Sequence, residues 1–417
     1  MKNVMSSLKS GDWRALVACF LYFDTGFTVW VLYGPLAPFI SKSISMTPAQ
    51  QGLLVAVPVL SAAILRVTLG NLYQSAHGKR IALLGVLLSA VPTIVLPVLP
   101  FVPSYTLLLV LGVFLGVGGA SFAVALPMAG SNYPPKVQGL VLGLAAAGNI
   151  GAVLDGFLFP QLATHYGWQV ATGGALPLLA IAAITLYFWA NDSGVKTGSV
   201  LRAFGGFAVT LVGLIVLVLL VEAGIFGSGK TGVLLCFVGM SSYVSLLLTN
   251  LYQLSKIDAG LFMALLAATG ALVRPLGGLI ADKVSGVRAL TVLLATISLC
   301  DLVFAAVMPS LAGGIALLVC LYLAFGLGNG ATFQLVPHRW AGRTGLMSGI
   351  VGAAGGIGGF YLPVVMGIAK ESTGSYQMGF ATFGALAACA FLAIVALRRP
   401  WMAWSMQSAG MHAHATE

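Results

Sequence analysis

The chain has 417 residues, of which 59% are hydrophobic and only 7% are charged, and its net charge is +10. So little charge excludes a water-soluble domain, because such a domain could not cover that much apolar surface. A positive net charge can indicate a nucleic-acid partner, but here the basic residues gather on one side of a membrane, so no nucleic acid is expected.

Hydrophobic stretches of about 20 residues, each long enough to cross a bilayer, recur along the whole chain. They predict a polytopic, all-α membrane protein with twelve core spans. In chain order the predicted spans cover residues 14–40, 51–73, 80–100, 104–129, 138–162, 170–190, 232–252, 258–281, 289–308, 312–336, 345–369 and 377–397.

The basic residues sort between the two sides of the membrane once these spans are assigned. Of the 20 lysines and arginines, only Lys42, Lys256 and Lys370 fall outside; Arg66 and Arg274 lie within spans, and the rest lie inside. This asymmetry follows the positive-inside rule. It predicts a multi-pass protein of the plasma (inner) membrane with both termini in the cytoplasm.

A further apolar segment, residues 205–226, stands between the sixth and seventh spans. One extra crossing would invert the second half, yet the charges of that half are not inverted. We therefore expect a helix that does not cross, or one member of a re-entrant pair. The predicted domains are a six-helix bundle at 1–190, a central cytoplasmic connection at 191–231, and a second six-helix bundle with a short tail at 232–417.

The two halves of the chain repeat one another. "GVGGASFAVALP" in the first half resembles "GLGNGATFQLVP" in the second, and the glycine-rich run from Gly139 resembles the run from Gly345. Arg66 aligns with Arg274, 208 residues later, and the other pairs have nearly the same separation. Two parallel six-helix repeats make the major facilitator architecture, in which substrate lies near the membrane midplane between the halves.

Arg66 and Arg274 are expected at one depth, roughly 6 Å from the midplane by helical rise. A charged guanidinium is costly inside a bilayer and needs a reason to be there. One interpretation is a structural ion pair with a buried acid, for which Asp24, Asp155 and Asp301 are candidates. The other is an anion site, because each guanidinium offers parallel N–H donors to planar oxygens. The symmetric placement on the two halves favours the anion site.

Three more residues stand out near this depth. Phe122 and Phe333 occupy matched positions in the two halves, and Asn149 is a lone amide in an apolar, glycine-rich run. A ring from each half could cover the faces of a flat anion, with ordinary core packing as the alternative. The glycines around them remove side-chain bulk and let backbones approach closely, which is also common in plain helix packing.

The motifs resemble a known family. "QGLVLGLAAAGNIGA" and "GLMSGIVGAAGGIGGF" are similar to the two nitrate signature motifs of the nitrate/nitrite porter family of the major facilitator superfamily. "LYFDTGFTVWVLYGPLAPFI", "GASFAVALPMA" and "GNGATFQLVP" resemble its spans one, four and ten. The resemblance implies that Arg66 and Arg274 hold the oxygens of nitrate or nitrite. It also implies that Phe122 and Phe333 sandwich the ion and that Asn149 hydrogen-bonds near it.

The signature-motif glycines at matching positions are Gly139, Gly143, Gly148, Gly151, Gly345, Gly349, Gly352 and Gly355. Span seven departs from the family pattern, since this chain matches only from "FVGMSSYVS" onward, so no ligand from that span is carried over. Gly352 stands where some members place a serine.

The resemblance implies transport of nitrate and nitrite by alternating access, with proton-coupled uptake favoured over nitrate/nitrite exchange. Asp24 is the candidate proton carrier, because net anion uptake against an inside-negative potential needs a cation; a structural hydrogen bond is its alternative role. Transport of another small anion, such as formate or phosphate, and an anion sensor that does not cycle are the other hypotheses.

An enzyme is not expected, because all five histidines lie in loops or the tail. The cysteines show no C-x-x-C spacing, and no cofactor or metal is expected. The expected partners are nitrate, nitrite, protons and the lipid bilayer, and the protein is expected to be a monomer.

Overall fold

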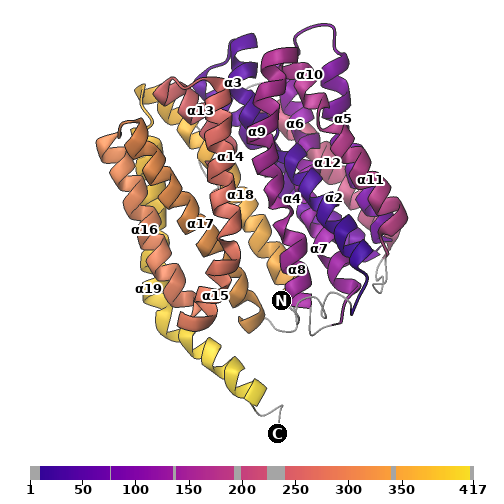
Figure 1. The fold of residues 1–417 in the computed structure, drawn as a ribbon, viewed down its shortest axis with the longest axis vertical. Coiled ribbons are helices and arrows are strands. Elements are labelled where there is room, and N and C mark those ends of the chain that lie inside the picture. The colour runs from indigo at the N-terminus through magenta and orange to yellow at the C-terminus, as the bar shows by residue number, and fades with distance from the viewer. Residues whose placement is uncertain are drawn as a thin grey trace. The chain divides into compact units, whose positions relative to one another are not determined.

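The computed structural model describes residues 10–75, 77–134, 138–191, 199–222, 240–339 and 344–413, and every regular element in these ranges is a helix (Figure 1). Ten of the described helical segments are long and apolar enough to cross a membrane. The prediction of an all-α polytopic membrane protein is therefore confirmed.

The contacts between helices divide the chain into two compact units. The first unit comprises residues 1–264 and 352–368, and the second comprises residues 265–351 and 369–417. This division differs from the domain boundaries drawn from the sequence repeat, because helix ends from the second half of the sequence pack against the first half. The organisation into two six-helix bundles stays a prediction.

The helices of the first unit follow one another closely. They are α2 (Trp13–Val31), α3 (Tyr33–Ser43), α4 (Pro48–Ser75), α5 (Gly78–Val98), α6 (Tyr105–Ala120), α7 (Phe122–Ser131), α8 (Gln138–Ala146), the 3₁₀ helix η2 (Ala147–Ile150), α9 (Gly151–Tyr166), α10 (Trp168–Gly173), α11 (Leu176–Trp189), α12 (Val200–Glu222) and α13 (Met240–Tyr252). Two helices, α14 (Lys256–Leu272) and α18 (Thr344–Thr373), have residues in both units.

Several predicted spans are broken within their length. The span at 14–40 divides at Leu32, before Pro35, whose missing N–H leaves the Val31 carbonyl without its helical donor. The span at 138–162 is not one helix, because η2 interrupts it at the glycine-rich run. The span at 258–281 divides at Val273, ahead of Pro275. Each of these ranges is helical, as hydropathy predicted, but local backbone chemistry decided where the helices break.

Glycines allow the helices of the first unit to cross at backbone contact. A Cβ atom added to Gly26 on α2 would lie 2.7 Å from the carbonyl oxygen of Gly118 on α6, and one added to Gly118 would lie 2.6 Å from the Gly26 carbonyl oxygen. A Cβ atom at Gly116 would likewise meet Ser61 on α4. Close approach of this kind is how helices gain packing energy where lipid removes the hydrophobic driving force.

Segments from the second half of the sequence join the first unit at the end where α3 and α5 finish. A Cβ atom at Gly52 on α4 would meet the carbonyl oxygen of Pro363 on α18, and one at Gly260 on α14 would lie 2.6 Å from the Gly156 carbonyl oxygen on α9. The Asn250 side chain donates to the Gln51 side chain at 3.3 Å. α13 thus packs against α3 and α4, and single close approaches join α18 to α4 and α14 to α9.

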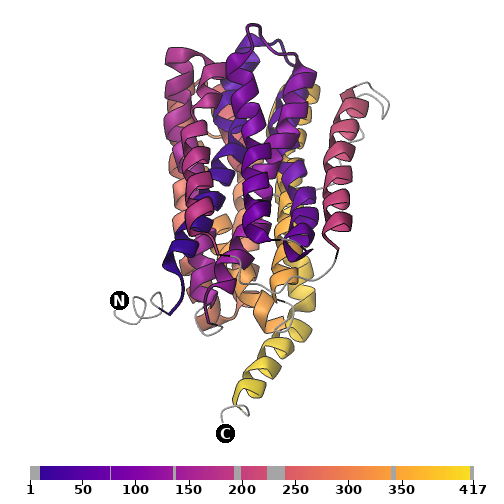
Figure 2. The same cartoon turned by 90° about the vertical axis from the view of Figure 1, so that its right-hand side faces the viewer.

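The extra apolar segment forms the helix α12, which confirms that the central connection contains an additional helix. It packs against α4 and α6 and runs alongside them (Figure 2). Residues 200–219 are long and apolar enough to cross a membrane. This placement favours a helix that lies in the membrane with its neighbours. Whether it crosses stays a prediction, and residues 223–239, which include the end of the segment and the start of predicted span seven, lie outside the described residues.

The second unit is built from α15 (Arg274–Val284), α16 (Gly286–Val307), α17 (Leu311–Arg339) and α19 (Gln377–Ala413), with part of α14 and of α18. Gly330 on α17 lies against the Arg274 backbone, so α15 and α17 also cross at backbone contact. The rings of Phe304 and Phe380 stack at 3.9 Å between α16 and α19.

Replacing Gly26 by alanine should destabilise the protein by about 1–3 kcal/mol, because the new methyl group would push α2 away from α6. Gly213→Ala is the matched control, since Gly213 lies on α12 with no atom within 4 Å of an added Cβ. Thermal unfolding of the purified variants in detergent measures both. Equal losses of stability in the two variants would contradict backbone contact at the α2–α6 crossing.

Candidate functional site

The centre of the candidate site is the guanidinium of Arg66, which lies in the second half of the long helix α4. Its Nε donates to the Gly119 carbonyl oxygen on α6 at 3.0 Å, and its Nη1 donates to the Gly352 carbonyl oxygen on α18 at 2.9 Å. All three residues belong to the first unit. Two backbone carbonyl groups therefore hold the charge in place of an acid.

Two aromatic rings cover the same guanidinium. Its carbon lies 5.0 Å from the ring centroid of Trp30 on α2 and 5.4 Å from that of Phe122 on α7, within the range of cation–π attraction. The Trp30 indole is itself fixed, because its Nε1 donates to the Pro58 carbonyl oxygen at 3.0 Å. The guanidinium is thus oriented by its surroundings before any ligand arrives.

Arg66 retains hydrogen-bonding capacity. No carboxylate pairs with it in the part of the chain that the structure describes, so the ion-pair interpretation finds no support there. A guanidinium has five N–H donors, and the two bonds to carbonyl oxygens use two of them. The remaining donors are available to an oxyanion.

Phe122 belongs to a cluster of rings on α2 and α7. Phe23 meets Phe122 edge to face, with centroids 5.4 Å apart, and Phe27 lies between Phe23 and Trp30 at 5.9 and 5.1 Å. Sequence reasoning overlooked Phe23, Phe27 and Trp30. Their spacing of four and then three residues, which puts them on one face of a helix, was the signal that could have identified them.

Asn149 lies in η2, the 3₁₀ turn that separates α8 from α9. The flanking glycines bring this turn onto α2: a Cβ atom at Gly148 would lie 2.8 Å from the Asp24 backbone nitrogen, and one at Gly151 would lie 2.5 Å from the Asp24 carbonyl oxygen. The Gly148 position also borders Phe23, so the turn reaches the ring cluster. The structure therefore brings the Asn149 turn, Phe122 and Arg66 into one neighbourhood.

Two carboxyl groups lie beside this neighbourhood. Asp155 on α9 is fully buried, and the charge of Asp24 on α2 acts on it. Neither oxygen of Asp155, nor Oδ1 of Asp24, has a hydrogen-bond partner in the described part of the chain. Sequence reasoning singled out Asp24 but treated Asp155 only as a possible ion-pair partner.

The second unit holds Arg274 at the first position of α15, directly after the break at Val273. Its Nε is buried and has no hydrogen-bond partner among the described residues. Asp301 on α16 is also fully buried without a partner for either oxygen there. The Phe333 backbone lies in α17, but its side chain is outside the described residues. The convergence of Arg66 and Arg274 on one ligand stays a prediction.

The remaining signature glycines are helical. Gly139 and Gly143 lie in α8, and Gly345, Gly349 and Gly355 lie in α18; the surroundings of the first four are outside the described part of the chain. Gly352 differs from Gly148 and Gly151, because an added Cβ atom there would lie 3.8 Å from both Arg66 Nη1 and Phe122 Cε1. Its carbonyl group accepts the hydrogen bond from Arg66, and an added Cβ atom would make only ordinary van der Waals contacts.

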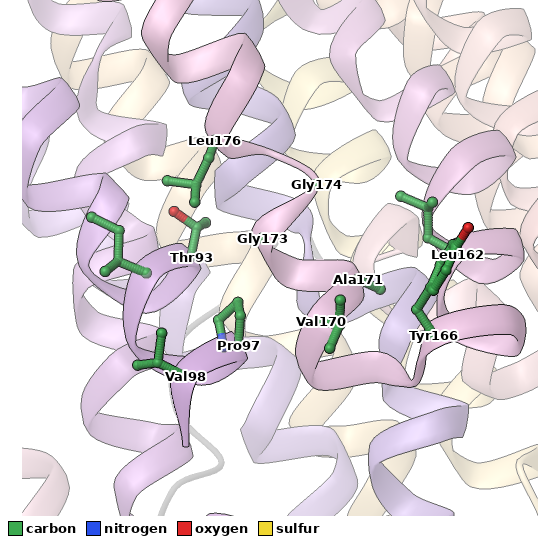
Figure 3. A pocket seen from close by; sticks show the side chains of 11 residues that line it. Thr93, Pro97, Val98, Leu162, Tyr166, Val170, Ala171, Gly173, Gly174 and Leu176 are labelled. Atoms are coloured by element: carbon green, nitrogen blue, oxygen red, sulfur yellow. The ribbon is translucent and has the colours of Figure 1, made fainter. Parts of the chain in front are cut away.

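A cavity elsewhere in the first unit is unsuited to an anion. A cavity of about 420 Å³ lies between α5, α9, α10 and α11 (Figure 3). Its walls include Pro97, Leu162 and Val170 and contain no charged side chain. No group of three or more histidine, cysteine or acidic residues that could bind a metal occurs among the described residues.

Comparison with known proteins identifies the chain's relatives. Residues 18–363 match the family model described as "Major Facilitator Superfamily". The chain is 31% identical to the "Probable nitrate/nitrite transporter NarK2" of Mycobacterium tuberculosis, over 94% of this chain and 97% of the relative. It is 30% identical to the "Probable nitrate transporter NarT" of Staphylococcus carnosus, over 87% and 91%. The "Nitrite extrusion protein" of Bacillus subtilis is 29% identical over 91% of both chains.

Solved structures share the fold at low sequence identity. A POT family transporter in complex with a thioalcohol-conjugated peptide matches with a TM-score of 0.70 and 14% identity, covering 92% of this chain and 96% of that one. The inward open conformation of the xylose transporter XylE from E. coli matches with a TM-score of 0.64 and 12% identity, over 91% and 94%. These likenesses confirm the predicted fold class.

Two signature glycines should respond differently to alanine. Gly151→Ala places a methyl group against the Asp24 carbonyl oxygen and should cost about 1–3 kcal/mol of stability. The Gly352→Ala variant should unfold at nearly the wild-type temperature, because its added Cβ atom would make only ordinary van der Waals contacts. Thermal unfolding in detergent distinguishes them. A loss of stability at Gly352 as large as that at Gly151 would show that the Gly352 position cannot accept a Cβ atom without strain.

Proposed function

Because this chain belongs to the Major Facilitator Superfamily and, within it, to the nitrate/nitrite porter family, we propose that it carries nitrate and nitrite across the plasma membrane by alternating access. Membership of a transporter superfamily agrees with the prediction that the chain is not an enzyme. The relatives named for nitrate or nitrite support the choice of substrate.

The observation that best supports the proposal is the environment of the Arg66 guanidinium. Its guanidinium is held by two carbonyl oxygens and two aromatic rings, lacks an acid partner in the described part of the chain, and keeps free N–H donors. A planar oxyanion complements such a fork, because two of its oxygens can accept parallel hydrogen bonds. In the proposed site Arg274 supplies the second fork, Phe122 and Phe333 cover the ion, and Asn149 donates near it.

In alternating access, a bound ligand changes the free-energy difference between the carrier's conformations relative to that of the empty carrier. Fixed positive charge in a site without water disfavours rearrangement, and a bound anion offsets part of that charge. We assign the end of the first unit that contains Lys42 to the outside and both termini to the cytoplasm, as the charge distribution favours. The close contacts of α4 with α18 and of α9 with α14 join segments from both halves of the sequence within the first unit.

Coupling to protons is the favoured way to drive net uptake, since an anion must be moved against an inside-negative potential. Asp24 is the proposed proton carrier. It lies on α2 at the turn that holds Asn149, where an added Cβ atom at Gly148 or Gly151 would meet its backbone. Exchange of nitrate for nitrite is the alternative, and it needs no titrating group. The proposed carrier works as a monomer in the bilayer and needs no cofactor.

Replacing Arg66 by lysine keeps the charge but removes the planar fork. We expect nitrate uptake into proteoliposomes to fall about 10- to 100-fold, since a hydrogen bond to a charged group contributes about 1.5–3 kcal/mol. Arg80→Lys on the exposed start of α5 is the control and should transport normally. Near-normal flux in Arg66→Lys would contradict the model of a bidentate anion site.

The same assay tests the alternative functions. Nitrate binding without flux in the wild-type protein would identify a sensor, and faster formate or phosphate flux would identify another substrate.

Replacing Asp24 by asparagine should separate the two coupling modes. If Asp24 carries the proton, the variant should lose the stimulation of nitrate uptake by an imposed inward pH gradient and retain exchange of external nitrate for internal nitrite. Flux is measured with a nitrate electrode, with and without internal nitrite. A stimulation by the gradient equal to that of the wild-type protein would exclude Asp24 as the carrier.

A further inference from the structure

A hollow of about 490 Å³ lies in the first unit at its proposed outer end, and no residue of the candidate site lines it. Its walls come from both halves of the sequence: Phe39, Lys42 and Ser43 on α3, Trp168 at the start of α10, and Lys256 at the start of α14. We call it the two-lysine hollow. It exists because the start of α14 packs against the ends of α3 and α9.

The hollow carries an excess of positive charge. Lys42 and Lys256 are two of the three basic residues expected outside, and their ammonium groups are close enough to repel each other. Neither lysine forms an ion pair in the part of the chain that the structure describes. The acid nearest in sequence, Asp258, accepts a hydrogen bond from the Ser255 hydroxyl at 2.6 Å, and that hydroxyl accepts from the Asp258 backbone N–H at 3.1 Å and so caps α14. The beginning of α14 adds the positive end of a helix dipole.

The hollow also has an apolar, aromatic wall. The Lys256 ammonium lies 4.4 Å from the centroid of the Phe39 ring, and the Trp168 indole donates to the Ser43 hydroxyl at 3.1 Å. Aromatic rings beside lysines at helix ends are typical of the membrane interface, where lipid phosphates lie. A volume of about 490 Å³ far exceeds the needs of a four-atom nitrate ion. Lysine binds phosphate as a flexible point charge, without the fork that a planar anion requires.

We propose that the two-lysine hollow binds the phosphate of an anionic phospholipid from the outer leaflet. The lipid bridges the two halves of the sequence, with Lys42 on one side and Lys256 on the other. Opening the outer end separates these lysines, so a lipid that needs both binds the outer-closed state better and shifts the population towards it. The proposal rests on the proposed membrane orientation and is independent of which anion is transported.

The test uses the purified full-length chain in neutral detergent and does not involve flux. Short-chain phosphatidylglycerol is titrated at constant ionic strength, and the melting temperature is recorded against phosphatidylcholine of the same chain length. Phosphatidylglycerol should raise the melting temperature in a saturable way, as expected for a ligand that binds the folded protein. Lys42→Gln and Lys256→Gln should each raise the half-maximal lipid concentration about fivefold, the expected contribution of one lysine to binding an anionic lipid surface.

Lys370→Gln is the matched control, because it removes the third outer lysine, whose ammonium donates to the Gly374 carbonyl oxygen at 2.8 Å. It should respond to lipid as the wild-type protein does. Lys42→Arg and Lys256→Arg retain charge and should retain the response, which separates loss of binding from loss of folding. Equal shifts in all variants, or no shift in the wild-type protein, would overturn the proposal. A shift produced by nitrate and not by phosphatidylglycerol would instead assign the hollow to capture of small anions.

Discussion

The described half of the candidate site depends on how a partly buried guanidinium is held without a counter-ion among the described residues. A carboxylate partner would neutralise Arg66 but would also occupy the donors that a substrate needs. Carbonyl oxygens and aromatic faces stabilise the charge only in part, because each carries a dipole or a quadrupole and no net charge. The two carbonyl bonds to Gly119 and Gly352 and the rings of Trp30 and Phe122 therefore fix the guanidinium and leave it attractive to an anion.

This arrangement needs helices that approach closely and break at defined points. Phe122 begins α7 directly after the break at Ser121, and the Asn149 turn is a 3₁₀ segment between two helices. The turn reaches α2 because Gly148 and Gly151 have no side chain to prevent backbone contact with Asp24. Glycine thus contributes to the site in two ways: it permits irregular backbone, and it removes the bulk that would keep neighbouring helices apart.

Two kinds of positive site occur in the first unit, and their chemistry differs with their environment. Arg66 is enclosed by aromatic rings and backbone, where a rigid planar cation can orient an anion. Lys42 and Lys256 lie at helix ends, where water can solvate an ammonium and a flexible side chain can follow a mobile lipid. In the proposed carrier the inner site recognises the transported anion, and the outer one influences which conformation is populated.

The sequence by itself determined the positions of most spans, because about 20 apolar residues are needed to cross a bilayer, and it paired Arg66 with Arg274 through the repeat. It could not show that Trp30 covers Arg66, that the Gly352 carbonyl group is an acceptor, or that Lys42 and Lys256 share a hollow. Those facts join residues as far as 286 positions apart, and they depend on helix rotation and on breaks at prolines and glycines. Hydropathy fixes where a helix crosses the membrane, but only packing in three dimensions decides which face meets which neighbour.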